Sequence, residues 1–299
     1  MTGARRPRPF ELVPRRRFVG APFGRRRSAR RGQGDEVAGT RPYRPGDLPA
    51  HIHWPASARL SSARGTDEFV VREFYADEAP RVAIACDRRP AMAIGGAPHR
   101  LDKRAAVRAC AELIAASAAA ELADLAWADG ASARPVRVRG PVASRLDGAF
   151  TGSERSLQLA LDALGRHAAH LPAGSFVFAI SDFLAPVRPA TWLRCRSLGW
   201  DVVPVIVQDP VWERSFPAVG GVALPLADAD GGRVEEVWIG EREARRRAAA
   251  NEERHAALVR RFRRLGFDPV PIDSADPAAV SRRFGAWAER RRLLRAGRP

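Results

Sequence analysis

The sequence predicts an α/β fold built on a doubly wound, mostly parallel sheet with an antiparallel edge hairpin. Helical patterns and short apolar runs alternate from residue 80 to residue 290, as in a parallel sheet covered by helices on both faces. Two runs, 82–86 and 176–180, are apolar throughout, which indicates strands buried on both faces. Asp87 and Asp182 close these strands, so both should emerge at the carboxyl edge of the sheet, where open sheets place ligands.

Local patterns define the individual elements of this region. Alanine-rich stretches with leucines at helical spacing predict helices, alternation of apolar and charged residues predicts exposed strands, and Gly199 and Gly266 end helices. Pro204 lies inside an apolar run and favours an edge position or a bulge for that strand. In chain order, the predicted elements are a strand at 82–86, a helix at 101–127, paired strands at 125–128 and 135–139, a helix at 153–170, a strand at 176–181, a helix at 190–198, a strand at 202–207, a hairpin of 222–226 and 234–239 turning through 228–232, a helix at 241–265, a strand at 269–272 and a helix at 277–294.

Residues 1–33 are predicted to form a basic tail that is disordered or docks in an extended form. Arg, Pro and Gly dominate the tail, and such a segment cannot bury enough apolar surface to offset the entropy lost on ordering. Residues 1–31 hold eleven arginines against one acid, Glu11, and so contribute +10 to the formal charge of +16. Only one lysine, Lys103, stands beside 49 arginines. Genomic base composition can produce this bias, and contact with nucleic acid or an acidic partner is the alternative explanation.

The sequence lacks the features that are typical of several classes of protein. No stretch approaches the roughly eighteen apolar residues of a membrane helix, and no signal peptide follows the arginine-rich start, so we expect a cytoplasmic protein. The three cysteines, Cys86, Cys110 and Cys195, are widely spaced and indicate buried thiols rather than disulfides or a zinc site. The sequence contains no nucleophile elbow, phosphate-binding glycine loop, zinc-protease motif or dinucleotide fingerprint. We therefore predict that the protein is not an enzyme.

Residues 34–79 differ in character from the region that follows. Prolines, glycines and paired charges argue against a long helix at 34–59, whereas the alternation at 68–74 predicts an edge strand. The segment contains a dense block of charged, aromatic and turn-forming residues. Its members are Gly34-Asp35-Glu36, Arg41, Tyr43, Pro45-Gly46-Asp47, Ile52, Trp54, Ala56-Ser57-Ala58-Arg59, Val71-Arg72-Glu73-Phe74 and Glu78.

This block resembles the signature of the domain of unknown function 58 family. The elements Asp87 to Met92, Ser181-Asp182-Phe183 and Asp209-Pro210 follow at matching places, so the resemblance covers residues 34–290. It implies a von Willebrand factor A-like fold at 80–294, with residues 34–79 as a family-specific segment that packs on this main domain. It also implies a bacterial or archaeal origin and frequent operation beside a MoxR-type AAA+ ATPase.

Proteins of this fold usually carry a metal-ion-dependent adhesion site. Mg²⁺ is held there by an Asp-x-Ser-x-Ser loop, a threonine from a second loop and an aspartate from a third, and a partner's carboxylate completes the octahedron. In this sequence Asp87 begins the first loop, but Arg89 and Ala91 stand where the two serines would be, and Asp182 remains for the third loop. The second-loop threonine has no clear counterpart, and the hydroxyl residues available there are Thr151, Ser153 and Ser156.

These substitutions predict a degenerate adhesion site that binds a partner without a metal. Two carboxylates without hydroxyls make a poor Mg²⁺ cage, and metal binding through Asp87 and Asp182 is kept as the alternative. Two expectations follow for Arg89. It either replaces the metal as the resident cation, by pairing with an aspartate or by donating the two N–H groups of its guanidinium to a partner carboxylate, or it points to solvent.

His51 and His53 form a second possible metal pair, since alternate strand positions share a face. The pair lacks a third ligand, and the family usually has Asp at the position of His53, so we interpret His53 as a structural hydrogen-bonding residue. Tyr43 and Trp54 are interpreted as packing anchors rather than as a binding platform.

Together these observations predict a non-enzymatic interaction protein without a cofactor or a membrane insertion. By resemblance, its partner is a MoxR-type AAA+ ATPase, with which it would act as an adaptor or substrate-presenting factor in the assembly or maturation of a complex. The alternative function is binding of nucleic acid or another acidic polymer through the arginine-rich tail and the helix at 241–265.

Overall fold

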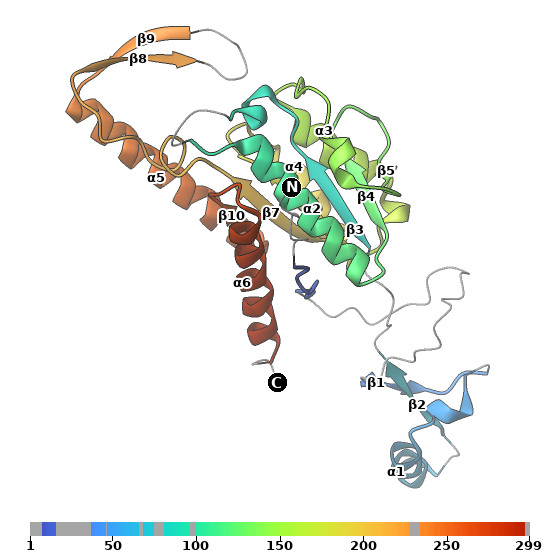
Figure 1. Ribbon diagram of the computed structural model, residues 1–299. Coiled ribbons are helices and arrows are strands. Elements are labelled where there is room, and N and C mark those ends of the chain that lie inside the picture. The colour runs from blue at the N-terminus through green and yellow to red at the C-terminus, as the bar shows by residue number, and fades with distance from the viewer. Residues whose placement is uncertain are drawn as a thin grey trace. The chain divides into compact units, whose positions relative to one another are not determined.

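A computed structural model describes residues 8–15, 37–45, 47–65, 68–74, 81–95, 100–227 and 234–296 of the chain (Figure 1). The chain forms two compact units. Unit 1 consists of residues 1–15 together with 80–299, and unit 2 consists of residues 16–79.

Six strands form the central sheet of unit 1. From one edge to the other they are β5 (Val136–Arg137), β4 (Leu125–Ala128), β3 (Val82–Cys86), β6 (Phe176–Ser181), β7 (Asp201–Val207) and β10 (Val270–Ile272). All neighbouring pairs are parallel except β4 and β5. Numbered along the chain, these six strands have the order 3-2-1-4-5-6, which is a doubly wound order that reverses between β3 and β6. The predicted fold class is therefore confirmed.

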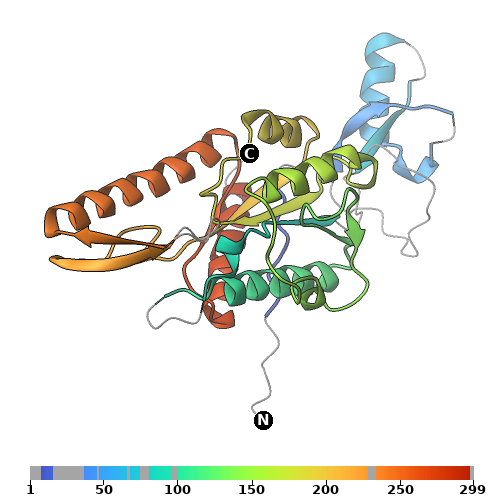
Figure 2. The same ribbon diagram turned by 90° about the horizontal axis from the view of Figure 1, so that it is seen from above.

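Helices cover both faces of this sheet (Figure 2). On one face, α2 (Lys103–Ala120) and α6 (Pro277–Ala296) pack in one hydrophobic cluster. On the other face, α3 (Ser156–Arg166) and α4 (Pro189–Ser197) pack in a second cluster. The core of unit 1 thus consists of two apolar layers separated by the sheet.

The strand β3 shows why its sequence is apolar without interruption. Val82, Ile84 and Cys86 belong to the cluster of α2 and α6, whereas Ala83 and Ala85 belong to the cluster of α3 and α4. Successive side chains of a strand point to opposite faces, so a strand covered on both faces needs apolar residues at every position. All five residues have 0% of their surface exposed.

Residues 8–15 pack on the face of the sheet that α2 and α6 cover. The ring of Phe10 stacks on that of Phe284 with centroids 4.8 Å apart, and the Phe10 N–H donates to Ser117 Oγ at 3.0 Å. Of the two forms expected for residues 1–33, this segment takes the extended docked one. The segment buries the apolar side chains of Phe10, Leu12 and Val13. The remainder of the tail lies outside the described residues.

A hairpin and a long helix follow β7. The strands β8 (Val222–Ala227) and β9 (Val234–Ile239) pair antiparallel, and α5 (Glu241–Arg264) begins two residues later. Figure 1 shows the hairpin joined to the start of α5. The hairpin is confirmed, but it forms a two-stranded sheet of its own, and the antiparallel edge strand of the central sheet is β5. Its predicted turn at 228–232 lies outside the described residues.

The position of β7 corrects an expectation based on its proline. Pro204 predicted an edge strand or a bulge, yet β7 lies between β6 and β10. Because β10 is short, it pairs only with residues 205–207 of β7. Pro204 precedes that paired stretch, so its missing N–H removes no bond to β10.

Unit 2 is a two-stranded sheet with one helix. The strands β1 (Val37–Pro42) and β2 (Val70–Phe74) pair antiparallel, which confirms the strand expected at 68–74. The expectation that residues 34–59 exclude a long helix is wrong, because the 11-residue helix α1 (Trp54–Arg64) begins there. Pro55 lies in its first turn, where no N–H is needed, and Gly65 ends the helix with a φ of 68°.

The remaining elements are short and connect the larger ones. They are the 3₁₀ helices η1 (Pro49–His51), η2 (Pro90–Ala93), η3 (Val142–Arg145) and η4 (Ala168–His170). The predicted helices at 101–127 and 153–170 are shorter in the structure, where they are α2 and α3. Among the helices described, none combines the length and the apolar character needed to cross a membrane.

Candidate functional site

Asp87 and Asp182 lie together at the carboxyl edge of the sheet, at the point where the strand order reverses. Asp87 follows β3 and Asp182 follows β6, and these two strands are parallel neighbours. The Asp87 N–H donates to the carbonyl of Ile180 at 2.9 Å and so extends the pairing past the end of β3. Both aspartates are buried, with 1% and 0% of their surface exposed.

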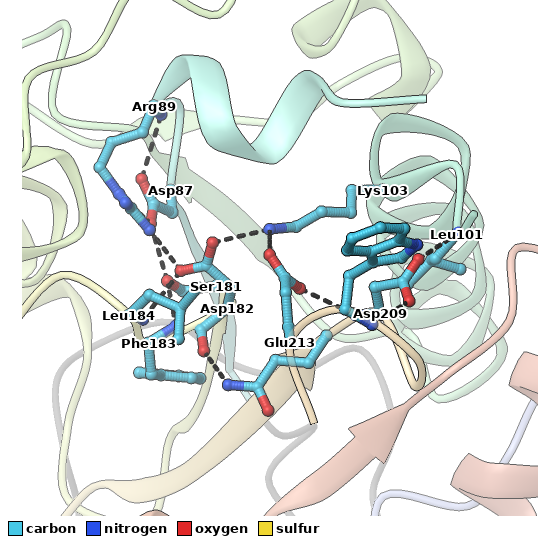
Figure 3. A network of polar contacts seen from close by, with 12 residues as sticks. Asp87, Arg89, Leu101, Lys103, Ser181, Asp182, Phe183, Leu184, Asp209 and Glu213 are labelled. Atoms are coloured by element: carbon cyan, nitrogen blue, oxygen red, sulfur yellow. Dashed lines mark hydrogen bonds and ion pairs between the residues drawn. The ribbon is translucent and has the colours of Figure 1, made fainter. Parts of the chain in front are cut away.

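The guanidinium of Arg89 joins the two aspartates (Figure 3). Its Nε donates to Asp87 Oδ2 at 3.0 Å, and its Nη2 donates to Asp182 Oδ1. The Arg89 N–H donates to Asp87 Oδ1 at 3.1 Å, and the residue is 3% exposed. Of the two expectations for Arg89, pairing with the aspartates is confirmed, and the solvent-facing side chain is not found.

Ser181, the last residue of β6, is a further hydrogen-bond partner of Asp87. Its hydroxyl donates to Asp87 Oδ2 at 2.7 Å and accepts the N–H of Phe183 at 2.9 Å. Phe183 has a φ of 56°, a left-handed conformation that is uncommon for a residue with a side chain. This turn directs the Leu184 N–H to Asp182 Oδ1, at 2.9 Å.

Lys103 and Glu213 extend the network, and the sequence did not single out either of them. Lys103 Nζ donates to Asp182 Oδ2 at 2.7 Å and to Glu213 Oε1 at 2.6 Å. Lys103 is 1% exposed although it stands in the first turn of α2. The one feature of the sequence that distinguishes Lys103 is that it is the only lysine beside 49 arginines.

The loop after β7 is fixed to the same network. Glu213 Oε2 accepts the N–H of Asp209 at 2.8 Å, and Asp209 Oδ2 accepts the N–H of Leu101 at 2.6 Å. Asp209 Oδ1 accepts two further N–H groups within its own loop. Loops from the ends of β3, β6 and β7 and the start of α2 therefore meet in one hydrogen-bonded cluster (Figure 3).

Burial and charge shift the pKa values of this cluster in different directions. Burial raises the pKa of Asp87, although Arg89 opposes the shift. Burial acts on Asp182 too, but Lys103 and Arg89 outweigh it and hold the pKa of this carboxyl below its usual value. Burial also raises the pKa of Glu213. The pKa values of the two carboxyl groups that bind Arg89 are therefore shifted in opposite directions. As the pH falls, Asp87 takes up a proton before Asp182 does.

Comparison with known proteins identifies the family to which the chain belongs. The family described as "Protein of unknown function DUF58" matches residues 39–258. The chain belongs to this family. The DUF58 match takes in most of β1 in unit 2 and the strands that carry Asp87 and Asp182, whereas residues 8–15 and α6 lie outside it.

Several solved structures are similar to this DUF58 protein. BatB from Bacteroides thetaiotaomicron is 12% identical, and the match covers 70% of this chain and 99% of BatB with a TM-score of 0.36. An aerotolerance-related membrane protein from Bacteroides fragilis is 10% identical, and the match covers 71% of this chain and 99% of that protein with a TM-score of 0.37. The pilus adhesin SpaC from Lactobacillus rhamnosus GG is 12% identical, and the match covers 72% of this chain and 31% of SpaC with a TM-score of 0.38. No curated protein matches the chain.

The residues at the carboxyl edge of this DUF58 protein do not fit a Mg²⁺ site. Each oxygen of Asp87 and Asp182 already accepts a hydrogen bond, and the donors include Arg89 and Lys103. Mg²⁺ needs about six oxygen ligands at about 2.1 Å, and the guanidinium lies between the carboxylates that would supply two of them. Ala91, at the position of the second serine, is buried and offers no side-chain oxygen. Within the described residues, no group of three or more His, Cys, Asp or Glu side chains could hold a metal ion.

Ser156 is the buried member of the three hydroxyl residues considered for the second loop. Its Oγ accepts the N–H of Arg88 at 2.8 Å and donates to the carbonyl of Asp129 at 3.3 Å. Thr151 and Ser153 are exposed. Ser156 therefore fixes the backbone of the loop that follows β3.

The predicted signature residues lie in unit 2, and the structure brings some of them together. Arg41 donates two hydrogen bonds to the carboxylate of Asp47, at 2.8 and 2.7 Å. With the backbone N–H of Arg44, these bonds lower the pKa of Asp47 to about 2. Ser57 Oγ accepts the N–H of Val70 at 2.9 Å and so ties α1 to β2. Pro45 and Arg59 are exposed, and Glu36 and Gly46 lie outside the described residues.

The histidine and aromatic residues of unit 2 have structural contacts. His53 Nδ1 accepts the N–H of Ala56 at 3.1 Å and caps α1, which confirms its structural interpretation. Tyr43 and Trp54 each meet Phe69 edge-on, with ring centroids 6.4 and 6.0 Å apart. Both contact a neighbour as packing anchors do, but 37% and 61% of their surfaces stay exposed.

Proposed function

We propose that this DUF58 protein is a non-catalytic interaction protein that binds a partner at the carboxyl edge of its central sheet without a metal ion. The observation that carries the proposal is the buried guanidinium of Arg89 between Asp87 and Asp182. It supplies a permanent positive charge in the place where an adhesion site of this fold would hold Mg²⁺. Its hydrogen bonds also give the site a fixed geometry without an exchangeable ion.

The hydrogen bonds of the cluster support a non-catalytic role. A general base needs a carboxylate within reach of a substrate proton, whereas the oxygens of Asp87 and Asp182 are buried and accept bonds from cationic, hydroxyl and backbone donors. The cluster is therefore suited to holding three loops and the start of α2 in one arrangement rather than to moving protons.

We propose a MoxR-type AAA+ ATPase as the partner and the cytoplasm as the compartment. The support for the partner is the family resemblance, and the support for the compartment is that no apolar stretch of the sequence approaches the length of a membrane helix. The protein would act as an adaptor or substrate-presenting factor in the assembly or maturation of a complex, and loops fixed by buried ion pairs would give the ATPase a rigid surface to recognise.

Nucleic-acid binding through the tail and α5 is the second candidate. The arginines of α5 are numerous, but several pair with glutamates of the same helix. These pairs are Arg245 with Glu241, Arg246 and Arg247 with Glu243, and Arg260 with Glu253. This pairing reduces the positive potential that a phosphate backbone would meet, so we rank this function second.

Calorimetric titration of the whole protein with Mg²⁺ and Mn²⁺ tests the metal-free site. We expect no binding, and we expect capture of a MoxR-type ATPase to be unchanged by EDTA. Micromolar Mg²⁺ binding that disappears in Asp87→Ala would overturn the proposal.

Salt-dependent DNA binding tests the second candidate. The tail should be neutralised at Arg25, Arg26 and Arg27 rather than deleted, because deletion would also remove Phe10 from the core. A steep salt dependence that disappears in the neutralised variant would favour nucleic-acid binding.

A further inference from the structure

Two arginines at the same edge of the sheet share one aromatic ring. The guanidinium carbon of Arg88 lies over the ring of Phe150 at 4.2 Å from its centroid, and that of Arg104 lies over it at 5.5 Å. Arg88 directly follows Asp87, and Arg104 directly follows Lys103. The pair is therefore a continuation of the buried cluster towards the loop that contains Phe150.

Backbone carbonyls of that loop hold both guanidinium groups in place. Arg88 donates to the carbonyls of Arg145 and Ala149, at 2.8 and 3.1 Å, and Arg104 donates to those of Leu146 and Gly148, at 3.0 and 3.2 Å. Carbonyl groups satisfy N–H donors, but they carry no net charge. The hydrogen bonds fix the positions of the two cations without neutralising them.

Neither cation has a carboxylate partner among the residues that the structure describes, in contrast to the arginines on either side. Arg89 pairs with two aspartates, and Arg108, one turn further along α2, pairs with Asp147 at 2.7 Å. Arg88 is only 9% exposed. A buried charge without a counter-charge is costly, and a second cation nearby adds repulsion. An anion placed against the pair would relieve both effects.

We propose that Arg88 and Arg104 form a docking site for a carboxylate-bearing, acidic segment of the partner protein. This inference rests on the proposed function, and it names the chemistry of the partner at the same edge of the sheet. Arg104 is half-buried, so it can be reached from solvent. Guanidinium groups suit this role because their planar fork matches the two oxygens of a carboxylate.

The surroundings favour an acidic protein segment over nucleic acid. Asp147 lies in the loop between Leu146 and Gly148, whose carbonyls hold Arg104, and its side chain is 64% exposed. A nucleic-acid backbone needs a continuous basic surface, and this carboxylate interrupts it. One or two carboxylates from a partner would match the charge of the pair.

Fluorescence anisotropy with a labelled hexaglutamate peptide tests the site in the full-length protein. Arg104→Gln should weaken binding about tenfold. Arg108→Gln changes the net charge by the same amount on the same helix face, and it should leave the affinity within about twofold. A hexaglutamine peptide should not bind. Equal losses in the two variants, or equal binding of the two peptides, would overturn the proposal.

A second measurement needs no variant. Phenylglyoxal modifies accessible arginines, and mass spectrometry of a digest locates the modified positions. Saturating hexaglutamate should protect Arg104 more than Arg108, and equal protection counts against the site. Duplex DNA that binds more tightly than the peptide and depends on Arg104 would assign the pair to phosphate and exclude the acidic segment.

The outcome is separable from that of the proposed function. If Arg104→Gln still captures the ATPase at wild-type level and hexaglutamate does not bind, this inference fails while the metal-free interaction site stands. If Mg²⁺ binds at Asp87 while hexaglutamate binding depends on Arg104, the proposed function fails and the acidic docking site stands.

Discussion

Arg89 Nε and Asp87 Oδ2 lie 3.0 Å apart, with only 3% and 2% of the two side chains exposed. A pair this deeply buried depends on both partners, because removing one leaves an uncompensated charge in the interior. In this protein the loss of the arginine would leave two charges uncompensated, since the same guanidinium also pairs with Asp182. The stability of the carboxyl edge is thus tied to one arginine.

Replacing Arg89 should therefore destabilise the fold. Arg89→Gln leaves two buried carboxylates side by side, and we expect a loss of about 3–5 kcal/mol in the free energy of unfolding at neutral pH. Urea denaturation followed by circular dichroism measures this quantity.

Arg108→Gln is the matched control for Arg89→Gln. Arg108 also pairs with an aspartate, but 37% and 64% of the two side chains are exposed, so its loss should change the free energy of unfolding by less than about 1 kcal/mol. Similar small losses in the two variants would show that the Arg89 pairs contribute little.

The raised pKa of Glu213 predicts a pH dependence of stability. Burial places the pKa of Glu213 above its ordinary value of 4.5, so the folded state binds this proton more tightly than the unfolded state. The resulting stabilisation is complete below pH 4.5 and is lost as the pH rises through the folded pKa. Glu213→Gln cannot lose this proton, so its free energy of unfolding should decline less than that of the wild type as the pH increases.

Urea denaturation at intervals from pH 4.5 to pH 8 checks the prediction for Glu213. The lower limit avoids Asp182, whose lowered pKa acts in the opposite direction and removes stability only as the pH falls below its ordinary value of 3.8. Parallel curves for the wild type and the variant over the whole range would contradict the assignment.

The packing of Phe10 predicts that the N-terminal segment contributes to stability. Phe10 is 7% exposed and contacts Phe178, Phe284 and Trp287. Phe10→Ala should lower the free energy of unfolding by about 3–5 kcal/mol because it leaves a cavity in the core. Arg8→Ala, at an exposed position of the same segment, should change it by less than about 0.5 kcal/mol. Thermal and urea denaturation measure both variants. If Phe10→Ala and Arg8→Ala had equal effects, the segment would not contribute to the stability of the core.

The sequence predicted the sheet and the meeting of Asp87 with Asp182 because both depend on local patterns. An uninterrupted apolar run fixes β3 as a strand covered on both faces, and parallel strands bring their carboxyl ends to one edge. Composition averaged over 33 residues, by contrast, concealed the short apolar segment around Phe10. Similarly, the prolines of residues 34–59 argue against a helix when they are counted together, although Pro55 lies in a first turn, where a proline is compatible with a helix.

The rest of the cluster depends on tertiary structure. Lys103 and Glu213 are 110 positions apart in the chain, and they meet only because α2 starts beside the loop that follows β7. No periodicity or motif encodes that proximity. Lys103 buried at the first turn of a helix is also against expectation, since lysines are almost never fully buried unless paired. Its two carboxylate partners explain the burial.

Restoring the hydroxyls should convert the edge into a metal site. In Arg89→Ser combined with Ala91→Ser, the loop reads Asp-x-Ser-x-Ser, and the guanidinium no longer occupies the space between Asp87 and Asp182. The hard oxygen ligands that Mg²⁺ prefers are then present. Calorimetry should detect Mg²⁺ binding that the wild type lacks, and Mg²⁺ should recover part of the stability lost with Arg89, by about 2.7 kcal/mol when its concentration is 100 times the Kd.

The control for this conversion is Arg89→Ala alone, which removes the guanidinium without adding hydroxyls and should gain little affinity. Lys103 still pairs with Asp182 in both variants, so any difference between them reports on the two serines. If the double variant binds no Mg²⁺ and unfolds at the same urea concentration with Mg²⁺ as with EDTA, Arg89 is not what excludes the metal. The cation at Lys103 would then be the group that closes the site, because it would be the remaining positive charge against Asp182.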